Sequence, residues 1–199
     1  MKMIDSEFMT VVIRDNSYVF SLLEEFSAVL WKTDAQNMTI KEFYDTWRDK
    51  NNIPEVYNIN TFTNLVRFIY AGILVPKEVW FKKIDDVKLS KLNGEWGIEE
   101  SDCCYSGGRK IGLRECITRI RNAVAHAEVK VNVPEDEYFA PSLLYEKTEI
   151  IFTDVDKYGN GGTFIAKLSA KKVIALINKL SQLSEESYIE EWKKEVKGR

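Results

Sequence analysis

Apolar side chains recur every three or four positions along most of the chain, a period that turns one face of an α-helix toward a core. Clear stripes of this kind cover residues 17–31 and residues 110–128. The full set of predicted helices is 17–31, 40–47, 60–71, 76–81, 110–128 and 170–183, followed by a charged helix over 187–197. The pattern therefore predicts a mainly α fold.

Capping residues mark several of these helix ends. Asn16 can cap the first helix, and Thr39 with Glu42 three positions later forms a capping box for the second. The other end signals are Gly72 just past the third helix, Pro76 at the start of the short fourth helix, and Ser169 before the helix that carries Val173, Ile174, Ile177 and Leu180. Capping signals and periodicity thus agree on where the helices lie.

Strand patterns occur only in the second half of the chain. Apolar and polar residues alternate over 129–133, and residues 149–153 and 163–168 are further strand candidates. Residues 154–162, rich in Gly, Asn and Asp, suit a hairpin turn between the last two strands. The stretches without a period are an acidic loop over 134–141 and a long loop from Leu89 to Arg109, which is expected to contain one helical turn and to pack down in part.

The order of elements predicts one domain over residues 1–199. Residues 1–109 would supply the N-terminal helices and the long loop, and residues 110–183 a helix, a small antiparallel β-hairpin and a C-terminal helix. The hairpin would thus be inserted before the C-terminal helices of a helical bundle. A hydrophobic content of 45% and a charged content of 30% suit a globular protein rather than a disordered one.

Charge and hydropathy limit the cellular locations and the binding partners that can be expected for the chain. The net charge of −3 argues against a protein coated in basic charge for nonspecific binding of long nucleic acid. No apolar run approaches the roughly 18 residues that a membrane span needs, and Met1–Asp15 has no signal-peptide pattern. We therefore expect a cytoplasmic protein without a membrane partner.

The cysteines and the histidine limit metal and disulfide chemistry. Cys103, Cys104 and Cys116 are odd in number and include an adjacent pair, so they are a poor disulfide framework and lack a CxxC spacing for zinc. We expect free thiols in a reducing compartment. His126 is the only histidine, which excludes a histidine-based metal cluster within one chain. Neither a metal nor another cofactor is expected.

That sole histidine closes the segment Arg121-Asn122-Ala123-Val124-Ala125-His126. Asn122 and His126 are four positions apart and so share one face of a helix. On a helical wheel His126 lies roughly 140° from the centre of the apolar stripe, while Arg121 lies at the border of the stripe. His126 is therefore expected to face solvent, a cleft or a partner chain.

The same helix reverses the charge of an otherwise acidic chain. Five cations fall within thirteen residues and only Glu115 opposes them before the histidine: Arg109, Lys110, Arg114, Arg119 and Arg121. Such a local excess can hold a phosphate while the rest of the surface repels bulk nucleic acid. Arg114 and Arg119 are the candidate auxiliary substrate contacts.

Histidine beside arginine suits cleavage of an RNA phosphodiester without a metal. The 2′-OH of RNA supplies the nucleophile, a neutral imidazole can take its proton, and an imidazolium can protonate the leaving 5′-oxygen. Arg121 can hold the phosphate and stabilise the charge that builds on it, and Asn122 can orient the imidazole or donate to a phosphate oxygen. The expected products are a 2′,3′-cyclic phosphate and a 5′-OH.

The spacing alone also fits plainer structural roles. His126 can be an exposed or capping histidine, the basic cluster a solvated helix face, and Arg121 a member of a surface ion pair. Other catalytic patterns are weaker, since Ser106-Gly107-Gly108-Arg109 lacks the Gly-Lys-Ser/Thr ending of a P-loop.

The segment Ile120 to Ala127 closely resembles the signature of HEPN domains, which is an apolar residue, Arg, a polar residue, small or apolar residues, and then His. The spacing between Arg121 and His126 lies within that family's range. Downstream, a strand over 150–154, a turn, Phe164 in a second strand and an amphipathic helix resemble the tail of HEPN proteins carried by bacteria, plasmids and phages. The resemblance covers residues 110–183, whereas residues 1–109 match nothing beyond a run of helices.

The resemblance implies a helical bundle that dimerises, so that Arg and His of both chains meet in one cleft. Many HEPN domains are metal-independent endoribonucleases of toxin–antitoxin, phage-defence or RNA-processing systems. By motif position, Arg121 and His126 carry over as catalytic residues and Asn122 as the supporting polar residue. A sizeable minority of HEPN proteins are not nucleases and only bind nucleotides or partners.

Three functions follow as hypotheses. The first is a homodimeric, metal-independent endoribonuclease whose partners are RNA, a second copy and a neutralising antitoxin. The second is a non-catalytic module that binds a nucleotide or a protein and dimerises through the same helix. The third is a structural accessory protein in which His126 is merely exposed.

Overall fold

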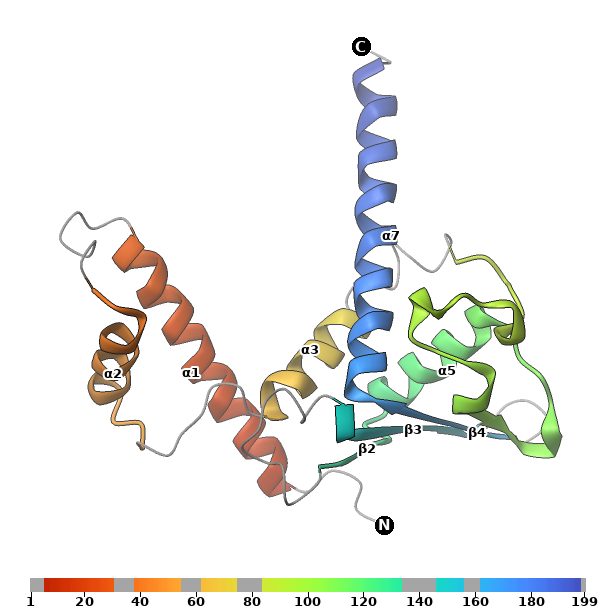
Figure 1. Ribbon diagram of the computed structural model, residues 1–199, viewed down its shortest axis with the longest axis horizontal. Coiled ribbons are helices and arrows are strands. Elements are labelled where there is room, and N and C mark those ends of the chain that lie inside the picture. Colours follow the sequence, from red (N-terminus) through yellow and green to blue (C-terminus); the bar gives the residue numbers. More distant parts are fainter. Residues whose placement is uncertain are drawn as a thin grey trace. The chain divides into compact units, whose positions relative to one another are not determined.

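The computed structural model describes residues 6–30, 38–54, 62–74, 84–133, 146–155 and 162–197 (Figure 1). By their contacts, residues 6–67 form one compact unit and residues 68–199 belong to another. Compactness alone does not decide whether two units fold together, so a single domain over residues 1–199 remains a prediction. The short helix expected over 76–81, the acidic loop over 134–141 and the tip of the predicted hairpin turn lie outside the described residues.

Helices α1 (Ser6–Leu30) and α2 (Ile40–Lys50) build the first unit. The predicted capping box at the start of α2 is confirmed. Thr39 Oγ1 accepts from the Glu42 backbone N–H at 3.1 Å, and the Glu42 carboxylate accepts from the Thr39 N–H at 2.8 Å. Trp47 is 1% exposed, and its indole N–H donates to Ser21 Oγ of α1 at 3.3 Å. The two helices thus share a small core.

Helix α1 is longer than its apolar stripe indicates. Asn16 lies inside the helix and does not cap it, because α1 already begins at Ser6. Residues 6–15 contain neither Pro nor Gly, so no residue in this stretch breaks the helix. The stripe over 17–31 located an apolar face of the helix but not the helix start.

A four-stranded antiparallel sheet lies at the centre of the second unit, with strand order β1-β4-β3-β2. The strands are β1 (Cys103–Tyr105), β2 (Val129–Asn132), β3 (Glu149–Val155) and β4 (Thr163–Ser169). The predicted pairing of the last two strands is confirmed, with Phe152 opposite Ala166. The sheet is larger than a hairpin because β2 pairs with β3 and β1 pairs with β4.

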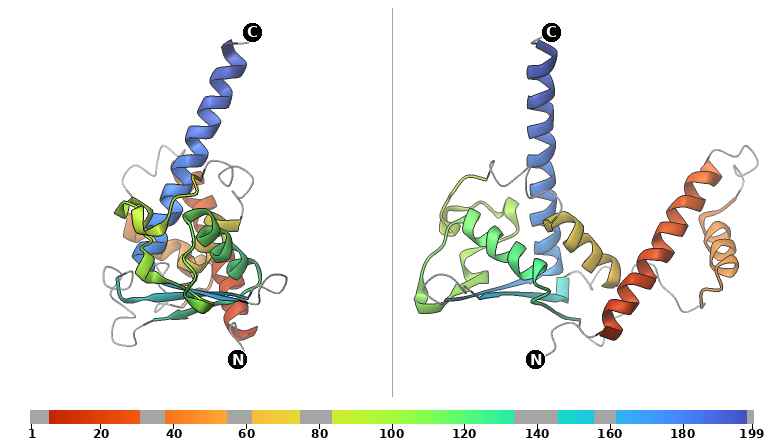
Figure 2. Two further views of the ribbon diagram at one scale, coloured as in Figure 1. Left: turned by 90° about the vertical axis from the view of Figure 1, so that its right-hand side faces the viewer. Right: turned by 180° about the vertical axis from the view of Figure 1, so that it is seen from behind.

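One face of this sheet carries the core of the unit. Helices α5 (Leu113–Ala125) and α7 (Ala170–Lys197) both lie on that face (Figures 1 and 2). Because side chains alternate along a strand, every second residue of β3 and β4 points toward the helices. The buried residues at these positions are Ile150, Phe152, Asp154, Phe164, Ala166 and Leu168. Asp154 is the one charged residue in this buried set.

Helix α3 (Phe62–Leu74) packs closely against α7 at Gly72. A Cβ at Gly72 would lie 2.4 Å from Ile177 Cγ2, so a larger residue here would require the Ile177 side chain to shift. The expectation that Gly72 follows the end of the helix is therefore wrong, since Gly72 lies inside α3. In sequence analysis a glycine near the end of a helical pattern is interpreted as the residue that follows the helix. In this fold Gly72 lies within the helix and contacts α7.

Helix α7 is a single 28-residue helix rather than the two predicted segments. Its start is as expected, because Ser169 Oγ accepts from the Lys172 backbone N–H at 3.2 Å. Residues 184–187 are polar but contain no Gly or Pro, so the helix continues through them. None of the described helices combines the length and the apolarity that crossing a membrane requires.

The stretch from Leu89 to Arg109 is more ordered than a loop with one helical turn. It contains four 3₁₀ turns, at residues 89–91, 94–96, 100–102 and 106–108, and strand β1. Lys172 of α7 binds Asp102 at 2.8 Å, and Lys179 binds Glu95 at 3.2 Å, so ion pairs fasten the stretch to α7. The expected packing of this segment is confirmed, because Tyr105 is buried.

Candidate active site

Helix α5 carries the Arg–Asn–His segment at its C-terminal end and is shorter than the predicted range of 110–128. It ends in a Schellman motif. The Ala127 N–H donates to the Val124 carbonyl at 3.1 Å, and the Glu128 N–H donates to the Ala123 carbonyl at 2.8 Å. Ala127 takes the left-handed conformation that this motif requires, with φ of 56°. His126 is therefore the C-cap residue of α5.

This helix end is fastened to the sheet. The Thr153 N–H of β3 donates to the Glu128 carbonyl at 3.0 Å, and the next residue of β3 is Asp154. The other face of α5 is buried against the sheet through Leu113, Cys116, Ile117, Ile120, Ala123 and Val124. His126 is exposed, as its position on the helical wheel predicted.

A chain of hydrogen bonds links the motif to a buried carboxylate. Arg121 Nη1 donates to Asn122 Oδ1 at 3.1 Å, and Asn122 Nδ2 donates to Asp154 Oδ2 at 3.4 Å. Asp154 is 5% exposed, so its position is fixed by the sheet. The bond to Asn122 also brings the Arg121 guanidinium beside the residue that shares a helix face with His126. The three motif residues are therefore organised around Asn122.

Asp154 also holds Arg119. Arg119 Nη1 donates to Asp154 Oδ2 at 3.0 Å, with the two side chains 15% and 7% exposed. Sequence reasoning named the strand over 150–154 but gave its aspartate no role at the site. A signal was present, because Asp154 continues the inward alternation of Ile150 and Phe152, and a buried carboxylate requires partners.

Arg121 is the motif cation with unused hydrogen-bonding capacity. Its Nε is buried and has no hydrogen-bond partner among the described residues, and no carboxylate of that part of the chain forms an ion pair with it. Buried donors without partners are rare and costly. An anion placed against this guanidinium would satisfy the charge and at least one donor.

The remaining cations of the basic cluster are mostly neutralised within the chain. Arg109 binds Glu115 at 3.0 Å and lies over the Tyr105 ring, and Lys110 binds Glu100 at 2.7 Å. Glu115 is the only acid within the basic segment, but in the folded chain Glu100 and Asp154 also approach these cations from other segments. A count of charges within one segment does not include acidic residues that lie far away in the sequence and approach the helix only in the folded chain.

A pocket of about 450 Å³ runs along α5 and brings some of the predicted site residues together. Its wall includes Arg114, Thr118, Arg119 and Asn122, together with Asp86, Gly112 and Glu115. Arg114 enters it held by the Ile84 carbonyl, which accepts from Nε at 3.0 Å and from Nη2 at 2.6 Å. Arg121 and His126 are not part of this lining.

Within one chain, no hydrogen bond between Arg121 and His126 occurs among the described residues. Five helical positions correspond to a rotation of roughly 140°, so the two residues leave the helix in different directions. The chain supplies a guanidinium on one side of the helix and an exposed imidazole at the helix end. Among the residues that the structure describes, neither the pocket along α5 nor a smaller pocket near Cys103 is lined by both Arg121 and His126.

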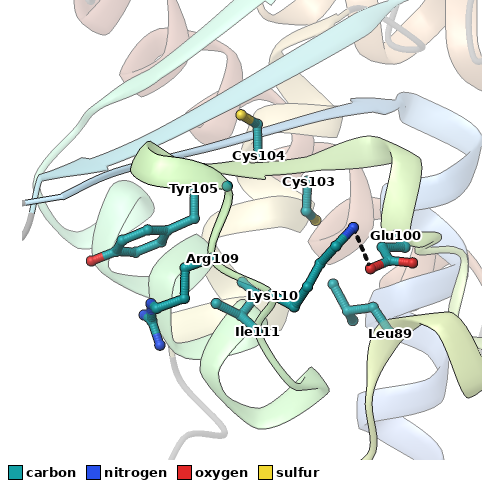
Figure 3. A pocket seen from close by; sticks show the side chains of 9 residues that line it. Leu89, Glu100, Cys103, Cys104, Tyr105, Arg109, Lys110 and Ile111 are labelled. Atoms are coloured by element: carbon teal, nitrogen blue, oxygen red, sulfur yellow. Dashed lines mark ion pairs between the residues drawn. The ribbon is translucent and has the colours of Figure 1, made fainter.

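The described residues contain no group of three or more His, Cys, Asp or Glu side chains arranged to hold a metal ion. A second pocket, of about 180 Å³, lies near the other end of α5 and is lined in part by Cys103, Arg109 and Lys110 (Figure 3). Its residues do not include any of the Arg–Asn–His segment.

Comparison with family models finds a match over most of the chain. A family model described as HEPN pEK499 p136 matches residues 12–191, which is nearly the whole chain and includes all three motif residues. No curated protein and no solved structure matches the chain.

Proposed function

The chain belongs to the HEPN pEK499 p136 family, and on that premise we propose that it is a metal-independent endoribonuclease whose active centre lies at the C-terminal end of α5. HEPN domains are often endoribonucleases. The observation that carries the proposal is the bonded series Asp154–Asn122–Arg121 beside the exposed His126. It presents an incompletely partnered guanidinium on the helix that ends at the only histidine of the chain.

Each motif residue has a role in cleavage by the 2′-OH of the RNA. Neutral His126 accepts the proton of the 2′-OH, or its protonated form delivers a proton to the leaving 5′-oxygen. Arg121 donates to the non-bridging phosphate oxygens and stabilises the charge that grows on them in the transition state. The products are a 2′,3′-cyclic phosphate and a 5′-OH, and the scheme uses no metal-bound water.

Asn122 acts in this scheme as the residue that positions Arg121. Its amide oxygen accepts a hydrogen bond from Arg121, and its amide nitrogen donates one to Asp154. The Asn122 side chain therefore connects Arg121 to the buried carboxylate. Both contacts fix which end of the amide is oxygen. A guanidinium held in this way loses less freedom when it binds phosphate, which favours the transition state.

We place the complete site between two copies of the chain. Support comes from the directions of Arg121 and His126, which diverge by roughly 140° on one helix. In a symmetric dimer the same patch meets itself, so Arg and His from both chains can line one cleft. If the cleft is shared, mixing inactive Arg121→Ala and His126→Ala proteins restores activity, to about a quarter of the wild-type value under random pairing. A mixture that stays inactive while its subunits exchange contradicts the shared cleft.

Arg114 is the better supported of the two auxiliary RNA contacts. It is held to the pocket wall by a neutral carbonyl, so its charge remains available to a phosphate. Arg119 is committed to Asp154 and lies near Glu115 at 3.7 Å. We therefore assign Arg119 mainly to holding Asp154, with any RNA contact secondary.

The biological setting we propose is a toxin–antitoxin or phage-defence system in the cytoplasm, where an antitoxin or other partner protein restrains the nuclease. The support is the family, which includes proteins of the plasmid and bacterial type. Induced expression should arrest growth with wild-type protein and not with His126→Ala. Growth unaffected by wild-type protein at high expression counts against a toxin.

A non-catalytic nucleotide- or protein-binding module is the second candidate. The observation that favours it is the internal neutralisation of Arg109, Lys110 and Arg119, which leaves few cations for a long RNA. This candidate predicts thermal stabilisation by a nucleotide without any RNA cleavage.

The deciding experiment is an RNA cleavage assay in EDTA. Wild-type protein, Arg121→Ala, His126→Ala and the control Lys130→Ala, which alters an exposed strand residue, are incubated with mixed RNAs. The proposal expects cleavage by wild type and control only. Cleavage that persists in both motif variants, or that needs added metal, contradicts it.

A further inference from the structure

Two of the three cysteines meet in the folded chain although their sequence positions make a poor disulfide framework. The Sγ atoms of Cys103 in β1 and Cys116 in α5 lie 3.4 Å apart. Cys103 is half-buried and Cys116 is 0% exposed. Neither thiol takes part in the proposed RNA chemistry, so this pair calls for its own explanation.

The geometry of strand β1 explains why Cys103, and not Cys104, lies against Cys116. Successive side chains of a strand point to opposite faces, so Cys103 faces α5 with Tyr105 while Cys104 faces away. Figure 3 shows the two thiols on opposite sides of β1. Cys104 is exposed and pairs across the sheet with Ile165. Cys103 and Cys116 are therefore the two thiols positioned to react with each other.

A pocket gives solvent access to one member of this pair. Cys103 lines the pocket of about 180 Å³ together with Leu89, Ile111, Arg109, Lys110 and Glu100, and the neighbouring Cys104 also belongs to this lining (Figure 3). A water molecule occupies roughly 30 Å³, so a small hydroperoxide fits with room for solvent. Cys116 is 0% exposed and is not among the residues that line this pocket. The pair thus has one accessible and one enclosed thiol.

We propose that Cys103 and Cys116 are a site of reversible oxidation by hydroperoxides, which closes to an intrachain disulfide between β1 and α5. The proposal is independent of the RNase assignment, because it rests on the thiols and their pocket. A disulfide requires the sulfur atoms to approach to about 2.05 Å. Strand β1 has three residues, lies at the sheet edge and pairs only with β4, so it is the element that can shift.

The oxidation proceeds in two balanced steps. The Cys103 thiolate attacks hydrogen peroxide, the O–O bond breaks, and hydroxide leaves with Cys103 as a sulfenic acid. Cys116 then attacks that sulfur, the S–O bond breaks, and the hydroxyl group leaves as water with the Cys116 proton. In sum, two thiols and one peroxide give one disulfide and two waters. A dithiol reductant reverses the change by exchange.

The surroundings assign the attacking thiol. The hydrogen bond with Cys103, followed by burial, holds the pKa of the Cys116 thiol well above its ordinary range. Cys116 is therefore harder to deprotonate than an ordinary thiol and does not make the first attack, since the thiolate is the nucleophile. It acts in the second step, where its proton passes to the leaving hydroxyl group. Cys103 has the solvent-facing position in the pocket and takes the first step.

The disulfide would tether the first turn of the helix that carries the Arg–Asn–His segment. Cys116 lies three residues after Leu113, the first residue of α5. Closing a short loop removes freedom mainly from the unfolded chain, so the oxidised form should melt several degrees higher, about 5 °C or more.

The test uses the full chain as the Cys104→Ser variant, which changes only an exposed thiol. Reduced protein is treated with a small excess of hydrogen peroxide, blocked with a thiol alkylating reagent and digested with trypsin. The expected product is peptide 92–109 joined to peptide 115–119, with loss of both thiols and recovery by dithiothreitol. A sulfenic-acid trap should label Cys103 in a Cys116→Ala protein.

Wild-type protein and urea-unfolded protein are the controls. Folded wild type should give the same linked peptides and keep one free thiol, while urea should abolish the preference for this pairing. Unchanged thiols in folded protein, a link that forms equally fast in urea, or oxidation confined to Cys104 would overturn the proposal. Because every readout is a thiol or a peptide, an inactive nuclease would not affect the outcome.

Discussion

The segment just before helix α5 and the C-terminal half of that helix carry similar basic side chains in different electrostatic settings. Near its start, Arg109 is bound to Glu115 and stacked on Tyr105, and Lys110 is bound to Glu100. Near its end, Arg121 bonds to the neutral Asn122 and keeps a buried donor without a partner in the described part of the chain. A cation that the fold has neutralised serves stability, whereas one held by a neutral group remains available to a ligand.

The comparison also explains why Asp154 matters. It neutralises Arg119, yet it reaches Arg121 only through the amide of Asn122. An aspartate bound directly to Arg121 would cancel the charge that a phosphate needs. The fold thus positions Arg121 through the uncharged amide of Asn122, which serves as a neutral relay to Asp154 and leaves the charge of the arginine in place.

The largest expected effect is a difference in catalytic activity between variants near the end of α5 and a variant just before its start. Arg121→Ala or His126→Ala should lower kcat/KM for RNA by about 10²-fold or more, since each removes transition-state stabilisation or proton transfer. Arg109→Ala, the matched loss of a neutralised arginine, should change kcat/KM by less than about threefold. An equal loss of kcat/KM in the Arg109→Ala and Arg121→Ala proteins would show that the two arginines do not differ as proposed.

The next effect concerns stability at Asp154. Asp154→Ala leaves Arg119 without its closest carboxylate in a largely buried setting, so the free energy of unfolding should fall by about 3 kcal/mol. Urea denaturation measures the change. Asp86→Ala removes an exposed carboxylate from the same pocket and should cost less than about 0.5 kcal/mol. Similar costs for the two variants would show that Asp154 is not the anchor.

A smaller effect is expected for the relay itself. Asn122→Ala should reduce kcat by about tenfold with little change in KM, because Arg121 remains but is no longer held in place. Asn93→Ala, at an exposed position whose side chain makes no capping bond, is the control. A variant that binds RNA more weakly at unchanged kcat would instead make Asn122 a substrate contact.

The smallest effect lies at the helix terminus. Ala127 adopts a φ of 56°, which costs a non-glycine residue roughly 1 kcal/mol, so Ala127→Gly should stabilise the protein by up to about that amount. Activity should remain near the wild-type value, because the Schellman bonds that place His126 are backbone bonds. Ala125→Gly, at the last residue of α5, should destabilise the protein by up to roughly 1 kcal/mol. A destabilised Ala127→Gly protein would contradict the assigned turn.

The sequence predicted the elements that follow from local periodicity and capping. Helix α5, the pairing of β3 with β4, the capping box at Thr39 and the exposure of His126 all follow from spacing within a few residues. Strand β1 did not follow, because three residues between 3₁₀ turns carry no measurable period.

The partners of the site were harder to predict because they come from distant segments. Asp154 reaches Asn122 across 32 positions, and Glu100 reaches Lys110 only because the preceding segment turns back. The thiol contact of Cys103 with Cys116 depends in the same way on how β1 lies against α5. Helix spacing located the motif residues, while tertiary packing decided which of their neighbours are charged.

The most direct test of the central claim changes one atom of the RNA. Once a cleavage position is mapped, an oligonucleotide with a single 2′-deoxyribose on the 5′ side of that bond is compared with the all-ribose oligonucleotide, both in EDTA. The account predicts that the 2′-deoxy bond resists cleavage and that the all-ribose RNA yields a 2′,3′-cyclic phosphate and a 5′-OH. Cleavage of both oligonucleotides at equal rates would contradict a 2′-OH nucleophile and with it the assigned roles of Arg121 and His126.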